Sequence, residues 1–302
     1  MKHLLPLKYL DTVARAGSIR KAAETLAITS TALNRRILDM EQDLGVQIFE
    51  RLPRGVRLST AGEIYIQHVR AQINDMERVR SQIADLSGEW RGNVSIACSQ
   101  ALLPYFLPEQ ISTYRYAHPA VTFNALLRDR AAAELALTDL SADLALVFEP
   151  VQMMKFQILL TIRQPLHAIM HRDHPLAGKE ILRLRECLEY PVALPSENIG
   201  VRHLLEIATR TTTHTLNPVI KSDSFEFLRH YALAENLLTF QIEIGIPAEF
   251  EDSDLISRPL NFRDVSPGLL YFGQLSGRTL SVAAARFAHQ MTEALASRFD
   301  VE

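Results

Sequence analysis

Residues 18–37 read S-I-R-K-A-A-E-T-L-A-I-T-S-T-A-L-N-R-R-I, and this stretch sets the fold of the N-terminal region. Two segments with helical spacing of small and apolar residues are separated by Ala27-Ile28, and a hydroxyl residue that can cap a helix precedes each of them. The stretch therefore predicts two short helices joined by a tight turn. The second helix places Leu33 and Ile37 on one side and short polar groups on the other, which is the pattern of a helix that reads base edges in a major groove.

The residues on either side extend this pair of helices. A first helix is predicted over residues 5–16, where apolar residues recur at helical spacing and Gly17 ends the run. The second should run from a cap at Ser18 to residue 26, and the third from Thr29 or Ser30 to residue 44, where a glycine stops it. For the third helix alone, a generic amphipathic helix with a solvated polar face remains the alternative.

A small hairpin is predicted directly after the third helix. Residues 46–51 alternate as in a strand, residues 53–55 (Pro-Arg-Gly) form a turn, and residues 56–58 return. The hairpin carries Arg51, Arg54 and Arg57, so it resembles the wing of a winged helix-turn-helix and is expected to contact phosphates or a minor groove. A merely solvated hairpin is the alternative.

Residues 59–86 predict one long helix. Its apolar residues repeat at close to 3.5 residues, which is typical of a helix that pairs with a second copy of itself. A homodimer is therefore expected, and packing of the stripe against its own domain is the alternative. The stripe consists of Ile66, Val69, Ile73, Met76, Ile83 and Leu86, with Val79 where the repeat drifts.

Composition indicates a soluble globular protein of 302 residues, with 47% hydrophobic and 22% charged residues. The longest apolar runs fall well short of the ~20 residues that a membrane span needs, and no secretory signal is recognisable. Cys98 and Cys187 are far apart and lie in apolar surroundings, which predicts buried thiols. These features together favour a cytoplasmic protein with no membrane partner.

The charge is divided unevenly along the chain. Residues 1–58 hold ten Lys and Arg against six Asp and Glu, whereas the remainder holds 22 against 29. A basic head on an acidic body is expected if only the head meets DNA phosphates.

Strand and helix patterns alternate from residue 91 onward, which predicts an α/β domain with a parallel sheet and right-handed crossovers. Strands are predicted at residues 94–98, 121–127, 144–148, 166–170, 191–194, 219–222, 237–241 and 269–274, and helices at 102–118, 131–140, 202–210, 225–234 and 282–299.

Residues 7–68 resemble the DNA-binding domain of LysR-type transcriptional regulators. The resemblance rests on the spacing of A-A-E-T-L, L-G-V-Q-I-F-E-R and L-S-T-A-G, which is highly specific as a set. The family commonly has Ser-Gln-Pro or Ser-Gln-Ser in place of Thr29-Ser30-Thr31, and Ser in place of Asn34, so its base preference is not carried over. The DNA-binding residues expected from the motif are Ser18, Arg20, Thr29, Ser30, Thr31, Asn34, Arg35, Arg51, Arg54 and Arg57.

The rest of the chain is similar to the family's effector domain, through G-N-V-S-I, S-A-D-L-A-L-V, H-P-L-A and the closing L-S-V-A-A-A-R-F-A segment. The resemblance implies a periplasmic-binding-protein-like pair of lobes joined by two crossover strands, an effector, and a homodimer or homotetramer that regulates transcription and meets RNA polymerase. The expected organisation is a winged helix-turn-helix at 1–58, a linker helix at 59–90 and an effector domain at 91–302, with lobe I at 92–161 and 266–302 and lobe II at 162–265.

Ligands of open α/β sheets bind beyond the carboxyl ends of the strands. Hydroxyl groups and backbone N–H groups at helix starts suit an anion, so a small carboxylate effector is expected, with no resident cofactor. The candidate contacts that follow predicted strands are Ser99, Gln100, Arg128, Phe148, Ser196, Asn198, Gly200 and Gly245.

No catalytic constellation is recognisable, so the expected protein is not an enzyme. His167, His171 and His174 have a spacing that suggests a metal, but no acidic or cysteine partner is fixed nearby, and no metal site is expected. An enzyme on the two-lobed domain and an architectural DNA binder without a sensor are the alternatives to a sequence-specific, effector-controlled regulator.

Overall fold

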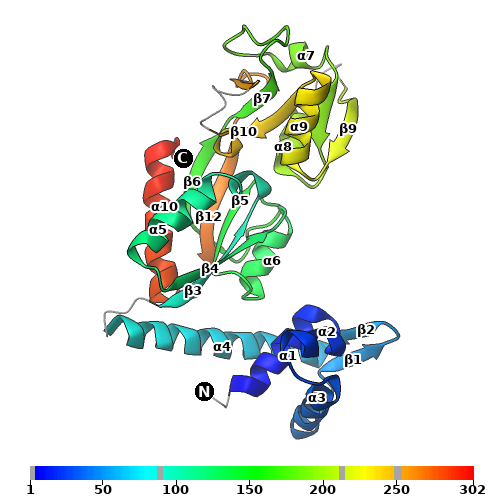
Figure 1. The fold of residues 1–302 in the computed structure, drawn as a ribbon, viewed down its shortest axis with the longest axis vertical. Coiled ribbons are helices and arrows are strands. Elements are labelled where there is room, and N and C mark those ends of the chain that lie inside the picture. The colour runs from blue at the N-terminus through cyan, green and yellow to red at the C-terminus, as the bar shows by residue number, and fades with distance from the viewer. Residues whose placement is uncertain (1–3, 87–90, 211–214, 248–253) are drawn as a thin grey trace. The chain divides into compact units, whose positions relative to one another are not determined.

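The computed structural model describes residues 4–86, 91–210, 215–247 and 254–302. The chain divides into two compact units, Met1–Ser87 and Gly88–Glu302, which are described separately (Figure 1).

The first unit is a winged helix-turn-helix followed by a long helix. Its cap residues are those predicted, because Ser18 Oγ accepts the N–H of Lys21 and Thr29 Oγ1 accepts the N–H of Ala32. The first strand starts three residues later than predicted, since Val46 is exposed and outside the hairpin. The elements are α1 (Leu5–Ala16), α2 (Ile19–Thr25), α3 (Ser30–Leu44), β1 (Phe49–Leu52), β2 (Gly55–Leu58) and α4 (Thr60–Leu86).

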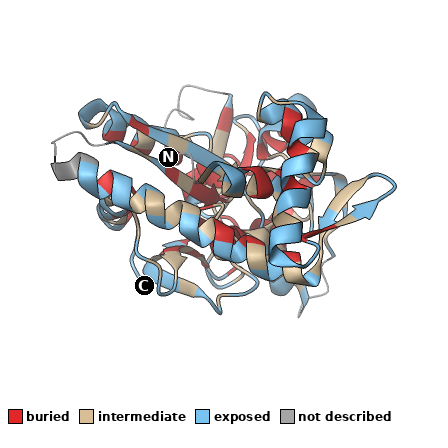
Figure 2. Cartoon of the chain, turned by 90° about the horizontal axis from the view of Figure 1, so that it is seen from below, coloured by how far each residue is buried: buried red, intermediate tan, exposed pale blue. Residues whose placement is uncertain are grey.

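A small apolar core holds these elements together. Leu10 and Val13 of α1 meet Leu33 and Ile37 of α3 in one buried cluster, and Val69 of α4 closes it. An ion pair adds to this packing, because Arg70 Nε lies 2.6 Å from Asp11 Oδ1 and so ties α4 to α1. The hairpin projects from the core and is largely exposed (Figure 2).

The apolar stripe of α4 is divided between two environments. Ile66 and Val69 are buried in the core of their own unit, and Ile73 packs against it. The prediction that the whole stripe faces a second copy is therefore wrong for these residues, because they cover the core of the three preceding helices. Val79 and Ile83 farther along α4 remain exposed, at 37% and 59%.

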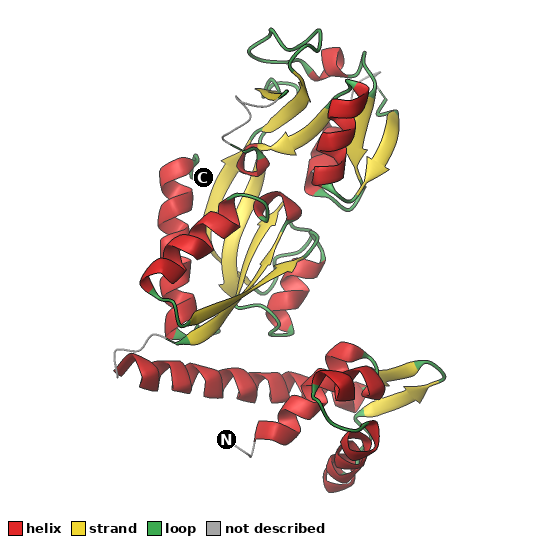
Figure 3. Ribbon diagram, viewed as in Figure 1, coloured by secondary structure: helices red, strands yellow, loops and turns green. Residues whose placement is uncertain are grey.

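Lobe I of the second unit is built on a five-stranded sheet in the order β4-β3-β5-β12-β6. Helices α5 and α10 lie on one side of the sheet and α6 on the other (Figure 3). The strands are β3 (Gly92–Cys98), β4 (Val121–Leu127), β5 (Leu144–Phe148), β6 (Phe156–Gln164) and β12 (Gly268–Leu275), and the helices are α5 (Phe106–Ala117), α6 (Ala132–Thr138) and α10 (Val282–Arg298).

The parallel sheet that the sequence predicts is right for β3, β4 and β5 but wrong for β12, which is antiparallel to both of its neighbours. The reason is the return of the chain: β6 leaves lobe I and β12 re-enters it, so the two run in opposite directions. Strand β6 is one of the two crossover strands that the family resemblance implies, but the residue pattern does not predict it, because it lies at the sheet edge and only two of its nine residues are buried.

Lobe II contains an antiparallel sheet in the order β10-β7-β11 and a parallel pair, β8-β9. A single bridge from Val192 to Leu238 joins β8 to the segment before β10. Strand β11, also at an edge, and the one-turn helix α7 were not predicted. The elements are β7 (Leu166–His171), α7 (Leu184–Cys187), β8 (Val192–Pro195), α8 (Gly200–Arg210), β9 (Pro218–Ser222), α9 (Phe225–Glu235), β10 (Thr239–Ile242) and β11 (Leu255–Pro259).

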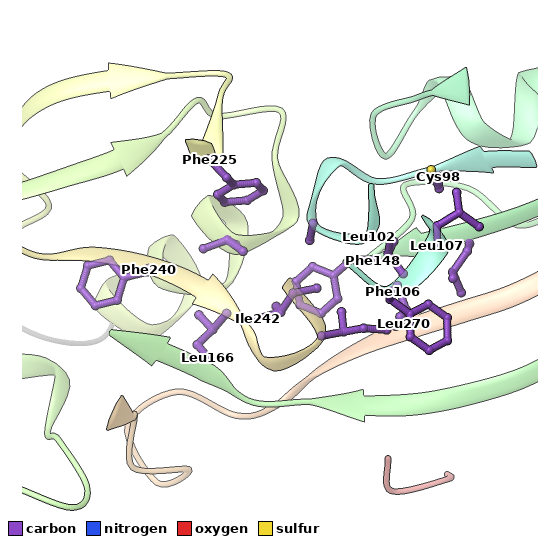
Figure 4. Packing of buried hydrophobic residues seen from close by; sticks show 14 of the residues in the cluster. Cys98, Leu102, Phe106, Leu107, Phe148, Leu166, Phe225, Phe240, Ile242 and Leu270 are labelled. Atoms are coloured by element: carbon purple, nitrogen blue, oxygen red, sulfur yellow. The ribbon is translucent and has the colours of Figure 1, made fainter. Parts of the chain in front are cut away.

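One apolar cluster runs through both lobes. Figure 4 shows Phe148 of lobe I between Phe225 and Ile242 on one side and Leu102 on the other. Cys98 and Cys187 are buried free thiols, as predicted, and burial raises the pKa of each to about 12. Within the described ranges, none of the helices has the length and apolar character of a membrane span.

Candidate DNA interface and effector cavity

The polar face of α3 is exposed where the sequence predicts base contacts. Ser30, Thr31 and Arg35 all lie on the solvent side of the helix, opposite the buried Leu33. Thr29 holds the N-terminus of α3, because its hydroxyl accepts the Ala32 N–H at 3.2 Å. The first turn of α3 thus presents short hydrogen-bonding side chains and backbone N–H groups together, an arrangement that suits the edge of a groove.

The three arginines of the hairpin occupy three different environments. Arg51 donates from Nη2 to Asn34 Oδ1 at 2.9 Å, which links the hairpin to α3. Arg57 donates from Nε to Glu50 Oε2 at 2.7 Å across the two strands. Arg54 is exposed in the turn. The sequence predicts one kind of contact for all three, whereas their surroundings differ.

Two further predicted residues lie on α2 and its cap. The Ser18 hydroxyl accepts the Lys21 N–H at 3.4 Å, so it holds the start of the helix. Arg20 is highly exposed and lies 3.3 Å from Glu24 one turn along the same face. Arg20 can exchange this exposed pair for a phosphate at little cost.

Sequence reasoning missed Glu41, which orients the hairpin. Its Oε1 accepts the N–H groups of Ile48 and Phe49 at 2.7 Å and 3.0 Å. An acidic residue near the end of a helix carries no local signal for this role, because its partners lie beyond the turn that follows. The contact fixes the direction in which β1 leaves α3.

A cavity of about 270 Å³ lies between the two lobes of the second unit. It is bordered by the segments that follow β3, β4 and β5 in lobe I and by the start of α8 in lobe II. Six predicted residues line it: Ser99, Gln100, Arg128, Phe148, Asn198 and Gly200. Ile199, which belongs to the same predicted strand-to-helix turn as Asn198 and Gly200, also lines it. The lining residues that were not predicted are Ala101, Leu127, Asp129, Arg130, Val201, Asp223, Phe225 and Ile242.

Two predicted residues lie elsewhere. Ser196 does not line the cavity; its N–H donates to Ser222 and its carbonyl accepts the N–H of Ile199, so it shapes the turn before α8. Gly245 borders a second cavity of about 260 Å³ and lies against Gln241. Both residues follow strands, but the rule that ligands bind beyond the carboxyl ends of strands does not state which of the following residues face the space between the lobes.

The cavity wall is held by hydrogen bonds between segments. Ser99 Oγ accepts the N–H of Phe148 at 3.2 Å, which joins the ends of β3 and β5. Gln100 Oε1 accepts the N–H of Phe225 at 2.9 Å and so connects lobe I to the start of α9 in lobe II. At Gly200 an added Cβ would lie 2.6 Å from the Phe148 ring, so only glycine permits this approach of the two lobes.

Two arginines and two aspartates border the cavity. Arg130 donates to the backbone oxygen of Glu149, and burial lowers its pKa while the nearby Glu149 carboxylate opposes that shift. Arg128 donates to the Leu127 carbonyl at 2.8 Å. The Asp129 carboxylate accepts N–H groups at the start of α6, at 3.0 Å and 2.8 Å, so its charge is already partly satisfied.

The three histidines with metal-like spacing lie in different surroundings. The ring nitrogens Nδ1 of His171 and His174 accept backbone N–H groups in the following turn, at 3.1 Å and 3.2 Å. Burial lowers the pKa of His167 to about 4. In the described part of the chain, no group of three or more His, Cys, Asp and Glu is arranged to hold a metal ion.

Comparison with known proteins agrees with this architecture. Residues 4–63 match the family described as bacterial regulatory helix-turn-helix protein, lysR family, and residues 87–296 match the LysR substrate binding domain. An uncharacterised HTH-type transcriptional regulator, YbhD of Escherichia coli (strain K12), is 30% identical over 249 residues, which are 82% of this chain and 76% of YbhD.

Solved structures share the fold over nearly the whole chain. A full-length variant of OxyR from Pseudomonas aeruginosa has a TM-score of 0.72 at 19% identity, covering 96% of this chain and 93% of that chain. Full-length CbnR complexed with its target DNA has a TM-score of 0.64 at 16% identity, covering 97% and 99%. With its helix-turn-helix and its two-lobed substrate-binding domain both matched, the chain belongs to the LysR family of transcriptional regulators.

Proposed function

We propose that this regulator binds one operator sequence preferentially and that a small carboxylate in the cavity between the lobes alters that binding. The observation that carries the proposal is the cavity itself, because residues from both lobes line it. A ligand that touches both lobes stabilises one relative arrangement of them over another, and a coupling of ~1–3 kcal/mol is typical of such control.

The chemistry of the lining supports an acid with an apolar body. Arg128 and the start of α8 at Gly200 offer donors to an anion, whereas Phe148, Phe225 and Ile242 offer apolar contact. The volume of about 270 Å³ lies at the small end of ligand pockets, which favours a compact molecule. The proposal gives the cavity a binding role and no catalytic one.

The exposed part of α4 supports a homodimer. Val79 and Ile83 lie one helical turn apart and are available to a second copy. A dimer would present two recognition helices to half-sites about 34 Å apart on DNA. The proposal also includes assembly into tetramers, contact with RNA polymerase and residence in the cytoplasm, which membership of the LysR family makes reasonable.

A ligand screen coupled to DNA binding tests the proposal. Small aliphatic and aromatic carboxylates would be screened by thermal shift, since a ligand bound to the native state raises apparent stability. Hits would then be added to the full-length protein on a duplex selected from a random library. We expect the hit to change operator affinity in the wild type and to have no effect in Arg128→Ala. Failure to select any preferred duplex would refute the proposal that the protein binds one operator sequence preferentially.

The size of the cavity provides a second test. Gly200→Ala places a Cβ against Phe148 and should abolish the thermal shift from the ligand. Gly178→Ala is the matched control, because nothing lies within 4 Å of a Cβ at that position. A ligand that stabilises the Gly200→Ala protein as well as the wild type binds elsewhere.

A further inference from the structure

The two faces of the β1–β2 hairpin give its arginines different roles. Phe49 pairs with Leu58, Glu50 with Arg57, and Arg51 with Val56. Since side chains alternate along a strand and opposed residues share a face, Arg51 projects from the face of the buried Phe49. Arg51 therefore lies on the core-facing side of the hairpin, beyond the core itself, and its side chain extends toward α3.

Arg57 lies on the opposite face and already has a partner. Its guanidinium is 2.7 Å from the Glu50 carboxylate directly across the strands. The net charge that this face offers to a phosphate is correspondingly small. Arg51 has no carboxylate in its hydrogen bond, since its partner there is the neutral amide of Asn34. Its full positive charge is available.

The hydrogen bond to Arg51 also constrains the Asn34 side chain. An asparagine that recognises adenine uses both ends of its amide, accepting from N6 and donating to N7. Asn34 Oδ1 instead accepts from Arg51 Nη2 at 2.9 Å. An amide oxygen has two lone pairs, so Oδ1 can still accept a second hydrogen bond, but the bond to Arg51 already orients the Asn34 amide. The Asn34 carbonyl thereby orients the Arg51 side chain, which reaches α3 from the hairpin.

We propose that Arg51 reads a guanine in the groove beside α3 and that Asn34 is the residue that positions it. A guanidinium has several N–H donors, so those left after the bond to Asn34 can donate to guanine O6 and N7. This inference rests on the proposed DNA-reading role of the first unit. It replaces the phosphate or minor-groove contact that the sequence predicts for Arg51 with a contact to a base edge in the major groove.

Guanine recognition has a chemical readout. The test measures the affinity of full-length proteins for the selected operator and for a scrambled duplex. The proteins compared are the wild type, Arg51→Ala, Arg51→Lys and Arg54→Ala. Arg51→Lys keeps the charge but loses the fork, so we expect both Arg51 variants to lose roughly tenfold to hundredfold in operator affinity. Arg51→Lys should retain affinity for scrambled DNA. Arg54→Ala should weaken both duplexes equally.

Replacement of single operator guanines by 7-deazaguanine, which lacks the N7 acceptor, then locates the contact. One position should weaken the wild type and leave Arg51→Ala unaffected. A double-mutant cycle tests the positioning role: if Asn34 acts through Arg51, adding Asn34→Ala to Arg51→Ala causes no further loss.

Other outcomes overturn the proposal. Equal losses on operator and scrambled DNA would make Arg51 a phosphate contact, and additive losses in the cycle would make Asn34 an independent reader. Thermal melting of each variant separates these results from misfolding. If the wild type selects no preferred duplex, the proposed function fails first, and that result is distinct from a wild type that discriminates without Arg51.

Discussion

Gly62 shows how a single residue joins the hairpin region to α4. A Cβ built at this position would lie 2.0 Å from the backbone oxygen of Ile48, a separation that real atoms do not adopt. Gly55 is equally constrained, because its φ is +110° and an added Cβ would lie 2.4 Å from the Gly17 oxygen. Both glycines therefore permit backbone contacts within the first unit that any larger residue would separate.

We expect Gly62→Ala to destabilise the first unit by about 1–3 kcal/mol, since the clash involves backbone and cannot be relieved by a rotamer change. Thermal unfolding followed by circular dichroism measures the effect. Gly178→Ala serves as control, because a Cβ at that position meets no atom within 4 Å. An unchanged melting temperature for Gly62→Ala would show that the approach of Ile48 is not needed for the fold.

His167 gives lobe II a dependence on pH. Burial lowers its pKa from 6.5 to about 4, so the native state holds the ring neutral where the unfolded chain would protonate it. The unfolded state therefore binds more protons below pH 6.5, and stability falls as the pH drops from about 6.5 to about 4.

The contribution of His167 to this loss should be at most about 1.4 kcal/mol per pH unit. Comparing urea unfolding of wild type and His167→Gln between pH 4 and 7 isolates it, and we expect the variant to have the shallower slope. His289→Gln, at an exposed position, is the control. Parallel profiles for wild type and His167→Gln would mean that the ring is solvated.

The two halves of helix α4 have different surroundings. Its first half contributes Ile66 and Val69 to the core of its own unit, and its second half exposes Val79 and Ile83. A regular apolar stripe cannot distinguish these roles, because both require the same spacing of residues.

We expect Ile83→Glu to produce monomers, since it puts a charge on the exposed part of the stripe, whereas Ile73→Glu would damage the core of the same unit. Sedimentation velocity measures the change. Ile64→Glu, on the same helix and 72% exposed, is the matched control and should sediment like the wild type. If Ile83→Glu also sediments like the wild type, the exposed end of α4 is not a dimer surface.

The two units have separate cores in the described part of the chain. One buried cluster joins α1, α2, α3, the hairpin and the first half of α4, whereas the second unit holds a larger cluster that joins both lobes and a smaller one between α6 and the lobe I sheet. Two cores that share no buried residue can unfold independently.

Calorimetry of the full-length protein should resolve two transitions, of which a bound carboxylate raises only the one from residues 88–302. A ligand at 100 times its Kd would add about 2.7 kcal/mol to that unit. Gly62→Ala should lower only the other transition. A single transition that shifts with both perturbations would show that the two units unfold together.

Much of the fold follows from local patterns. The helices α1 to α4 and the strands β3, β4 and β5 were predicted within a few residues, because helical spacing, caps at Ser18 and Thr29, and stop signals such as Gly45 act over a few positions. Local patterns did not identify the edge strands β6 and β11, since a half-exposed strand lacks the apolar run of a buried one.

Candidate residues of the cavity were found by a topological rule, which names strand ends but not the side chains that meet there. Six of the eight predicted residues line the cavity, whereas Asp223, Phe225 and Ile242 reach it from segments with no motif. Their roles depend on the angle between the lobes, which no short stretch of sequence encodes.

The amino-acid order by itself predicts a winged helix-turn-helix followed by an α/β domain, because capping, periodicity and turn chemistry are local, and the resemblance to the LysR family implies the two lobes. The three-dimensional arrangement alone determines that Arg51 meets Asn34, that Arg57 meets Glu50, and that half of the α4 stripe is core. The residues in these contacts are not separated by the regular spacings that identify helices and strands in a sequence. They follow from packing, in which each side chain takes the place that its neighbours leave open.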